Sequence, residues 1–321
     1  MLAVVVSELT GPAGMVVREV PEPDCDGNVL VEVKVAGVCF PDLLISYGKY
    51  QLRPEPPFVP GAEVAGVVVS APEGSGLAAG DRVLAMSDLG GYAERVAIPA
   101  QRVMRIPVQL DFEQAASLIV NYQTMEFALA RRAGLVPGET VVVLGAAGGV
   151  GTAAIQLASA HGARVIAVVR RSGAVDFLRE LGADEVVALD ENWTARVGEL
   201  TGDVGAQVVV DPVGGDAFDG AMRVLAPEGR LVVIGFAGGT IPSVRVNRVL
   251  FRNISVVGAA WGEFLRSHPD AMAQTHQALA DLVAAGLRPL VTARYPLTDA
   301  PRALEDLESG LVLGKAVLIR D

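Results

Sequence analysis

A glycine-rich turn between two apolar runs constrains the fold of this 321-residue chain more than any other feature. Residues 140–144 form a short, β-branched apolar run, which indicates a buried strand. The turn 145–151, with the sequence GAAGGVG, follows directly. An alanine-rich stretch then predicts a helix to about Ala160, and residues 164–169 indicate a second strand. This order of elements predicts a βαβ unit with a phosphate-binding turn at its first strand–helix junction.

The turn has the chemistry that a pyrophosphate requires. Gly148 and Gly149 lack Cβ atoms, so backbone N–H groups can approach an anion at the helix N-terminus, where the dipole favours negative charge. Gly151 is expected to let the helix pack closely on the strand. The pattern departs from G-x-G-x-x-G because Ala146 replaces its first glycine, and an ordinary strand-to-helix turn is the alternative. The predicted cofactor contacts here are Ala147, Gly148, Gly149 and Val150.

Composition excludes several classes of protein. No apolar run reaches the roughly 18 residues that a membrane span needs, and the first residues, MLAVVVSELTG, predict a strand rather than a signal peptide. The net charge of −11 disfavours general nucleic-acid or anionic-membrane binding. Two cysteines make no disulfide framework, which favours a reducing cytoplasm.

The pattern of strand, helix and turn signals changes along the chain. Up to about residue 120, short β-type runs separated by turn signals predict an all-β, partly closed barrel. From residue 121, strands alternate with helices, which predicts an α/β domain with a doubly wound, six-stranded parallel sheet. The strands are expected at 140–144, 164–169, 184–188, 207–211, 230–235 and 254–258. Residues 261–321 are expected to return to the first domain.

Motifs spread over almost the whole chain resemble the zinc-independent NADPH:quinone oxidoreductases of the medium-chain dehydrogenase/reductase superfamily. The matching segments include GVCFPDLLISYGKY (37–50), PFVPGAEVAGVV (57–68), LGAAGGVGTAAIQLA (144–158), VVDPVGG (209–215) and GKAVLI (314–319). The resemblance implies a GroES-like catalytic domain from residues 1–120 and 261–321, around a Rossmann domain at 121–260. It also implies a homodimer paired through sheet edges, for which the apolar run 254–257 is suitable.

The end of the second strand discriminates between NADPH and NADH. NAD-binding domains usually carry an acidic residue there, but this strand ends in Arg170-Arg171-Ser172. Because a guanidinium offers a fork of N–H donors to a phosphate, we predict NADPH, with Arg170 or Arg171 on the 2′-phosphate and Ser172 assisting. A solvated loop is the alternative. The family's frequent lysine and tyrosine nearby are replaced by Val175 and Leu189.

Further cofactor contacts are expected where parallel strands end, because ligands bind at that edge of a doubly wound sheet. Asp211 could contact the ligand or cap the following turn. The resemblance places Thr124 near the nicotinamide carboxamide and Gly258 near the nicotinamide. The expected contacts at the strand tips are Asp211, Val213, Gly235, Phe236 and Ala237.

No metal is predicted. Zinc-dependent relatives use a cysteine at the place of Cys39 and a histidine before the glutamate of a G-H-E motif, which here reads Gly61-Ala62-Glu63. Alanine cannot bind metal, and Cys39 and Glu63 alone do not supply the three protein ligands of a catalytic zinc.

The expected reaction is hydride transfer from NADPH to a small-molecule quinone or related conjugated carbonyl, with the cofactor supplying the chemistry and the protein the positioning. Tyr47, Tyr50 and Asn121 are candidates for lining or positioning the substrate, and each tyrosine could equally serve packing. Two alternatives stay open: an enoyl or enone (C=C) reductase, and a non-catalytic NADPH-binding protein.

Overall fold

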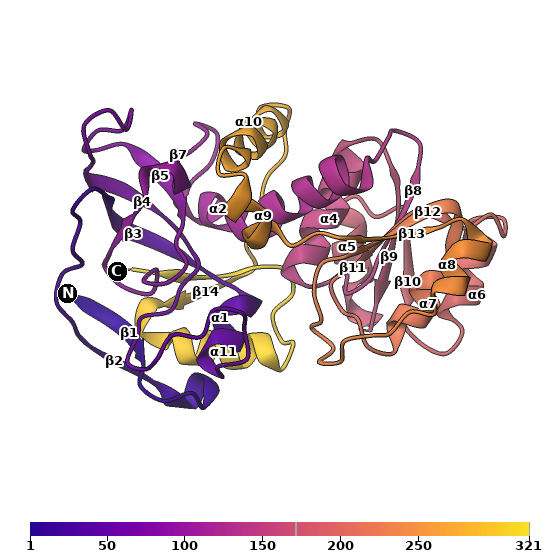
Figure 1. Cartoon of the computed structure of the whole chain (residues 1–321), viewed down its shortest axis with the longest axis horizontal. Coiled ribbons are helices and arrows are strands. Elements are labelled where there is room, and N and C mark those ends of the chain that lie inside the picture. The colour runs from indigo at the N-terminus through magenta and orange to yellow at the C-terminus, as the bar shows by residue number, and fades with distance from the viewer. Residues whose placement is uncertain (171, 321) are drawn as a thin grey trace. The chain divides into compact units, whose positions relative to one another are not determined.

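The computed structural model describes residues 1–170 and 172–320 (Figure 1). Its chain divides into two compact units, one made of residues 1–121 and 269–321 and the other of residues 122–268. The second boundary lies later than the predicted residue 261, because helix α9 (Trp261–Ser267) packs within the central unit. Its Trp261 and Phe264 rings lie 5.1 and 4.7 Å from the ring of Phe127.

The unit formed by both chain ends is built on a mostly antiparallel sheet. In the described part of the chain the strand order is β14-β15-β3-β4-β5-β7, with β6 also paired to β3. The strand β3 alternates buried and half-buried residues along its first half, which is the period that a two-sided strand requires. These strands are β3 (Val29–Val38), β4 (Glu63–Ser70), β5 (Arg82–Met86), β6 (Arg95–Ile98), β7 (Val103–Arg105), β14 (Ala293–Pro296) and β15 (Ala316–Ile319).

The described residues of this unit also form a β-hairpin and four α-helices. The hairpin strands are β1 (Leu2–Val6) and β2 (Met15–Glu19). The helices are α1 (Phe40–Ser46), α2 (Phe112–Ser117), α10 (Ala271–Ala284) and α11 (Ala300–Glu308). Asp111 begins α2, because its carboxylate accepts the backbone N–H of Gln114 at 2.8 Å in a capping box. The core is mainly valine, alanine and leucine from both chain ends.

The central unit is a six-stranded parallel sheet, as predicted. The strand order is β10-β9-β8-β11-β12-β13. Successive strands are therefore added outward on one side of β8 and then, from β11, on its other side, which makes β8/β11 the switch point of the sheet. The strands are β8 (Thr140–Val143), β9 (Arg164–Val169), β10 (Glu185–Ala188), β11 (Ala206–Asp211), β12 (Leu225–Val233) and β13 (Ser255–Gly258). The helices around it are α4 (Gly149–Ala160), α5 (Val175–Glu180), α6 (Trp193–Leu200), α7 (Ala217–Arg223) and α8 (Val246–Arg252). The mixed α/β fold class is therefore confirmed.

A helical stretch without a counterpart in the sequence analysis continues from α2. It passes through a π-helical segment η3 (Leu118–Gln123), one α-helical turn α3 (Thr124–Glu126) and a second π-helical segment η4 (Phe127–Ala133). Gly134 ends it with a left-handed conformation, φ 58°. π-Helical segments are uncommon and frequently mark functional sites. Nowhere in the described ranges is a helix both long enough and apolar enough to cross a membrane.

Candidate functional site

The glycine-rich turn joins β8 to α4 in the predicted geometry. Gly145 has a left-handed backbone, φ 58°, and its carbonyl accepts the N–H of Gly148 at 3.0 Å. Gly148 begins α4, and its own carbonyl accepts the N–H of Thr152 at 2.8 Å. The first N–H groups of a helix have no partner within the helix. The N-terminus of this 12-residue helix can therefore receive a phosphate.

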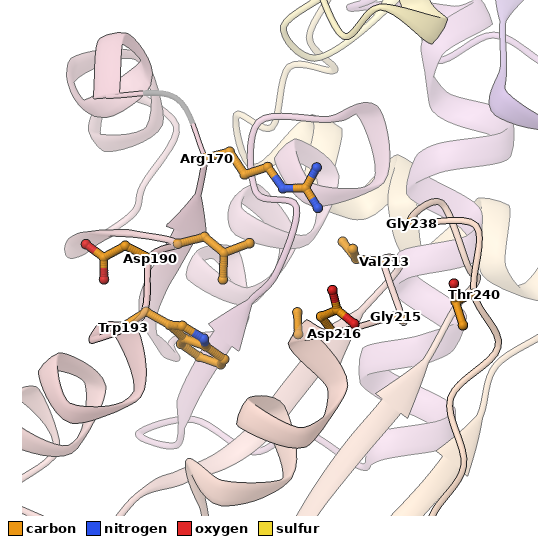
Figure 2. Close-up of a pocket in the computed structure, with 11 residues that line it drawn as sticks. Arg170, Asp190, Trp193, Val213, Gly215, Asp216, Gly238 and Thr240 are labelled. Carbon is orange, nitrogen blue, oxygen red and sulfur yellow. The ribbon is translucent and has the colours of Figure 1, made fainter.

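A pocket of about 350 Å³ lies at the carboxyl ends of the strands (Figure 2). It brings together Arg170, which follows β9, and Val213, which follows β11, both predicted as cofactor contacts. Most of the lining was not predicted, because it comes from loops and helix starts that are distant in sequence. The additional lining residues are Leu189, Asp190, Trp193, Gly214, Gly215, Asp216, Ala217, Gly238 and Thr240.

Arg170 is exposed at the end of β9 and lines this pocket. The acidic Asp190 also lines it, but its carboxylate is paired with Arg196 at 2.8 Å. That guanidinium lowers the pKa of Asp190 through a hydrogen bond to the carboxylate, helped by the backbone N–H of Asn192. The negative charge of Asp190 is thus partly neutralised beside Arg170. Arg171 lies outside the described residues, as does the side chain of Ser172.

Asp211 has the capping role that the sequence left as one of two alternatives. It is fully buried at the end of β11, and its Oδ1 accepts the N–H groups of Val213 and Gly214, both at 2.8 Å. Burial raises the pKa of this carboxyl, against the opposing effect of those two donors. Its Oδ2 has no hydrogen-bond partner among the described residues. Contact of Asp211 with a ligand stays a prediction.

The loop after β12 is tied to the loop after β11. Ala237 donates its N–H to Pro212 O at 3.1 Å, and Gly238 donates to Val213 O at 2.8 Å. Gly235 and Phe236 precede these contacts, and the Phe236 side chain is exposed. Gly258 ends β13, opposite Val233 in the register, and its carbonyl accepts Arg132 Nε at 2.8 Å. The cofactor contacts predicted for Gly235, Phe236, Ala237 and Gly258 stay predictions.

The predicted substrate residues have different surroundings. Tyr47 donates its hydroxyl to Glu308 Oε2 at 3.0 Å, and Lys49 Nζ lies 4.9 Å from its ring centroid, so its polar atom is already bonded within the fold. Tyr50 is half-buried, and burial raises its pKa, with a further contribution from the charge of Asp42. Asn121 is buried in η3, and Thr124 is buried at the start of α3.

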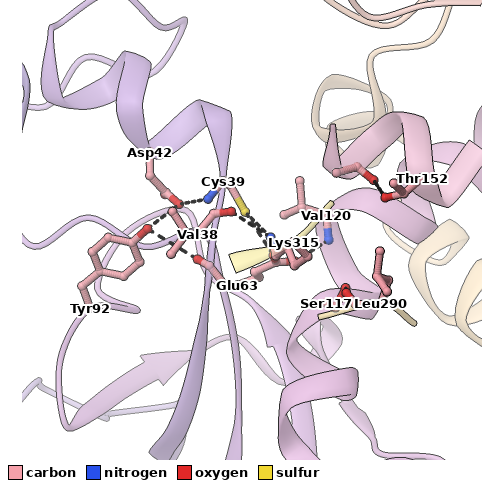
Figure 3. Close-up of polar contacts among 12 residues, drawn as sticks. Val38, Cys39, Asp42, Glu63, Tyr92, Ser117, Val120, Thr152, Leu290 and Lys315 are labelled. Atoms are coloured by element: carbon pink, nitrogen blue, oxygen red, sulfur yellow. Dashed lines mark hydrogen bonds and ion pairs between the residues drawn. The ribbon is translucent and has the colours of Figure 1, made fainter. Parts of the chain in front are cut away.

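A buried polar cluster surrounds the residues where zinc-dependent relatives bind metal (Figure 3). Lys315, immediately before β15, donates its ammonium to Glu63 Oε1, to Cys39 Sγ at 3.2 Å and to Val38 O at 3.1 Å. The Cys39 thiol donates to Glu63 Oε1 at 3.0 Å. The other carboxylate oxygen of Glu63 accepts the backbone N–H of Val120 at 2.6 Å.

Asp42 extends this cluster on its other side. Its Oδ2 accepts the Tyr92 hydroxyl and the Cys39 N–H, each at 3.0 Å. Burial raises the pKa of Asp42 to about 7, although Tyr92 and Lys315 stabilise its charged form. Burial also raises the pKa of the Cys39 thiol, with Glu63 adding to the effect, which favours the neutral thiol over the nucleophilic thiolate.

The ionic state of Lys315 follows from its neighbours. Burial opposes its protonation, but its interactions with Cys39 and Glu63 outweigh burial and raise the pKa of the ammonium. A positive charge therefore sits at the centre of the cluster. Sequence reasoning missed it, although an isolated lysine in the apolar run GKAVLI is a signal of a buried, paired cation.

The donor set of the cluster does not fit a zinc ion. Ala62 stands where a histidine ligand would be needed, and Lys315 contacts the two side chains that could bind metal, Cys39 and Glu63. Across the ranges 1–170 and 172–320, no group of three or more His, Cys, Asp or Glu side chains could hold a metal. A tetrahedral zinc site needs at least three such ligands.

Two family models match the chain on either side of its first domain boundary. Residues 25–108 match the alcohol dehydrogenase GroES-like domain, and residues 149–281 match the domain described as zinc-binding dehydrogenase. A GroES-like unit from both chain ends with a Rossmann unit between them defines a medium-chain dehydrogenase/reductase.

Similarity to individual proteins shows which family within this superfamily the chain belongs to. The chain is 40% identical over 266 residues to quinone oxidoreductase-like protein 2 of Bos taurus, covering 82% of this chain and 76% of the relative. It is 54% identical to a probable oxidoreductase from Mycobacterium abscessus (TM-score 0.93; 99% and 98% covered). It is 29% identical to Escherichia coli quinone oxidoreductase in complex with NADPH (TM-score 0.91; 99% and 100% covered). The chain belongs to the quinone oxidoreductase family of the medium-chain dehydrogenase/reductase superfamily, as its motifs predicted.

Proposed function

We propose that this oxidoreductase uses NADPH to reduce a quinone or a related conjugated carbonyl compound. The observation that carries the proposal is Arg170, which lines the pocket at the carboxyl ends of the strands. It stands at the strand end where NAD-binding domains usually carry an acid. The Escherichia coli relative, whose fold this chain shares, was solved with NADPH.

The central unit offers a separate group for each part of this cofactor. The N-terminus of α4 would bind the pyrophosphate through the N–H groups that follow Gly148. Arg170 or Arg171 would bind the 2′-phosphate, with Ser172 assisting. Thr124 would orient the carboxamide, and Gly258 would lie toward the nicotinamide. When bound, NADPH supplies the hydride, so the protein's task is to position the reactants and exclude water.

An acceptor without metal assistance must spread the developing charge itself. Quinones and enones do so by conjugation of the carbonyl, which fits a site whose donor set does not suit a zinc ion. Tyr50 and Asn121 are the better placed of the predicted substrate residues, because the Tyr47 hydroxyl already donates to Glu308. The proton that completes reduction would come from solvent or from one of these polar side chains.

We also propose that the chain forms a homodimer through one edge of the Rossmann sheet. The strand β13 is an edge strand, and the nearby helix α8 exposes three large apolar side chains. Val246 is 76% exposed, Leu250 68% and Phe251 78%. Exposed apolar residues gathered beside a free strand edge are typical of an interface between protein chains.

The acceptor assay tests the proposed reaction. NADPH oxidation would be measured with 1,4-benzoquinone, an enone and an enoyl thioester, and NADPH binding by fluorescence titration. Turnover with benzoquinone is expected. Turnover with only the enoyl thioester would make the chain a C=C reductase, and tight NADPH binding without any turnover would favour a non-catalytic binding protein.

A further inference from the structure

We propose that Glu63, held in place by Lys315, is a positioning residue that fixes the π-helical backbone carrying Asn121. The proposal deepens the proposed reductase function, because Asn121 is one of the residues expected to line the acceptor. Its basis is one contact: a buried carboxylate from the start of β4 accepts a backbone N–H from the middle of a helix, Val120 N to Glu63 Oε2 at 2.6 Å.

Each oxygen of Glu63 has its own partner set. Oε1 accepts from Lys315 and from the Cys39 thiol, whereas Oε2 accepts from Val120. Glu63 has no exposed surface, so these contacts replace its water shell. A buried carboxylate is tolerated only when paired and hydrogen-bonded. The carboxylate therefore cannot turn toward Val120 alone without breaking its bonds on the other side.

Lys315 is fixed as firmly as its partner. Only 2% of it is exposed, and an ammonium has three N–H donors. Those donors have three acceptors in reach, namely Glu63 Oε1, Cys39 Sγ and Val38 O. Val38 and Cys39 lie at the end of β3 and before α1, so Lys315 ties the orientation of Glu63 to the rigid sheet.

The register of the helix is the feature that this arrangement explains. A regular α-helix bonds each N–H to the carbonyl four residues earlier, and α2 does so up to Ser117. The helix widens to π geometry at Leu118, two residues before the N–H that Glu63 accepts. A side-chain acceptor that draws a mid-helix N–H outward favours such a change of register. Because about 100° of rotation separates neighbouring helical residues, the register decides where Asn121 points.

The decisive experiment compares Lys315→Met with Lys315→Arg, and uses Lys34→Met as the matched control. Lys34 forms an ion pair with Glu32 at the surface, 3.0 Å, outside the buried cluster. Lys315→Met is expected to lower kcat/KM for benzoquinone by tenfold or more, since a misplacement of about 1 Å can cost on the order of 10²-fold. Lys315→Arg should retain most activity, and Lys34→Met should match the wild type.

A double-mutant cycle separates positioning from general destabilisation. If Glu63 and Lys315 act through Asn121, then Lys315→Met should have little further effect in an Asn121→Ala background. Effects of Lys315→Met and Asn121→Ala that multiply independently would overturn the proposal. So would unchanged kcat and KM in Lys315→Met.

The Val120 amide gives a readout that depends neither on turnover nor on the folding of the methionine variant. In the wild type its NMR signal should lie downfield of the other amides of residues 112–133, as expected for a short hydrogen bond to a carboxylate, and Glu63→Gln should move it upfield. An ordinary Val120 shift in the wild type would contradict the proposal. Absence of quinone turnover with a downfield Val120 signal would reject the proposed reaction alone.

Discussion

Gly151, in the first turn of α4, packs directly on the backbone of Gly145 and Ala146. A Cβ atom added to residue 151 would lie 2.7 Å from Ala146 Cα, closer than real Cβ atoms approach backbone. Only a glycine therefore lets the helix begin this close to β8. The phosphate-binding turn and the packing of α4 consequently depend on the same residue.

Gly151→Ala is predicted to destabilise the fold by roughly 1 to 3 kcal/mol, the usual range for overpacking. The better helix propensity of alanine, about 1 kcal/mol, does not offset a clash with backbone that cannot move aside. Urea unfolding would measure the change. Gly148→Ala is the matched control for stability, because its added Cβ would meet only Gly145 O at 3.5 Å. Equal stabilities of the two variants would disprove the packing argument.

The buried carboxyl of Asp42 should make stability depend on pH. Its folded-state pKa, about 7, lies above the ordinary value of 3.8 because the side chain is buried. Between these values the folded state binds more protons than the unfolded state, so the contribution of Asp42 to stability falls as pH rises through 7. At about 1.4 kcal/mol per pKa unit, the expected loss between pH 5 and pH 8 is roughly 2 to 3 kcal/mol.

Asp42→Asn isolates this effect from the other titrating groups of the cluster. The asparagine keeps an acceptor for Tyr92 and Cys39 but cannot ionise. The difference in unfolding free energy between the wild type and Asp42→Asn should therefore shift in favour of the variant as pH rises from 5 to 8. A difference that stays constant over this range would show that Asp42 does not titrate there.

The proposed dimer gives a direct prediction for α8. Phe251→Asp places a charge on the most exposed apolar side chain of that helix and should convert a dimer of about twice the 33.3 kDa chain mass into monomers. Sedimentation velocity would measure both proteins. Val108→Asp, at an 87% exposed valine in the other unit, should leave the dimer intact. A wild type that sediments only as a monomer would reject the proposed interface.

The sheet of the central unit was predictable because its signals are local. Apolar β-branched runs alternate with helix patterns, and the glycine turn marks the first crossover. The spacing of apolar residues and the turn residues are therefore enough to predict which segments form the strands. The π-helical segments at residues 118–133 were not predictable in this way. For the first of them, the register at Leu118 is proposed to depend on Glu63, which lies more than fifty residues earlier in the chain than Val120.

The residues of the candidate site also differ in whether the local sequence predicts them. Arg170 and the turn 145–151 could be proposed as cofactor contacts because each follows a predicted strand in a known motif. Trp193 and Asp190 could not, because a helix start and a loop reach the pocket only through the folded topology. Lys315 pairs with Glu63 across 252 positions in the sequence, a relationship that no local pattern reports.

The central claim, a phosphorylated cofactor held by the arginines after β9, is tested most directly by binding constants for NADPH and NADH. They would be measured for the wild type, Arg170→Ala, Arg171→Ala and the double variant, with Arg266→Ala as an exposed-arginine control. The wild type should bind NADPH at least about tenfold more tightly than NADH. The double variant should lose that preference with NADH affinity unchanged, because charged hydrogen bonds contribute about 1.5 to 3 kcal/mol. A wild-type preference for NADH, or equal weakening of both cofactors in the double variant, would contradict the account.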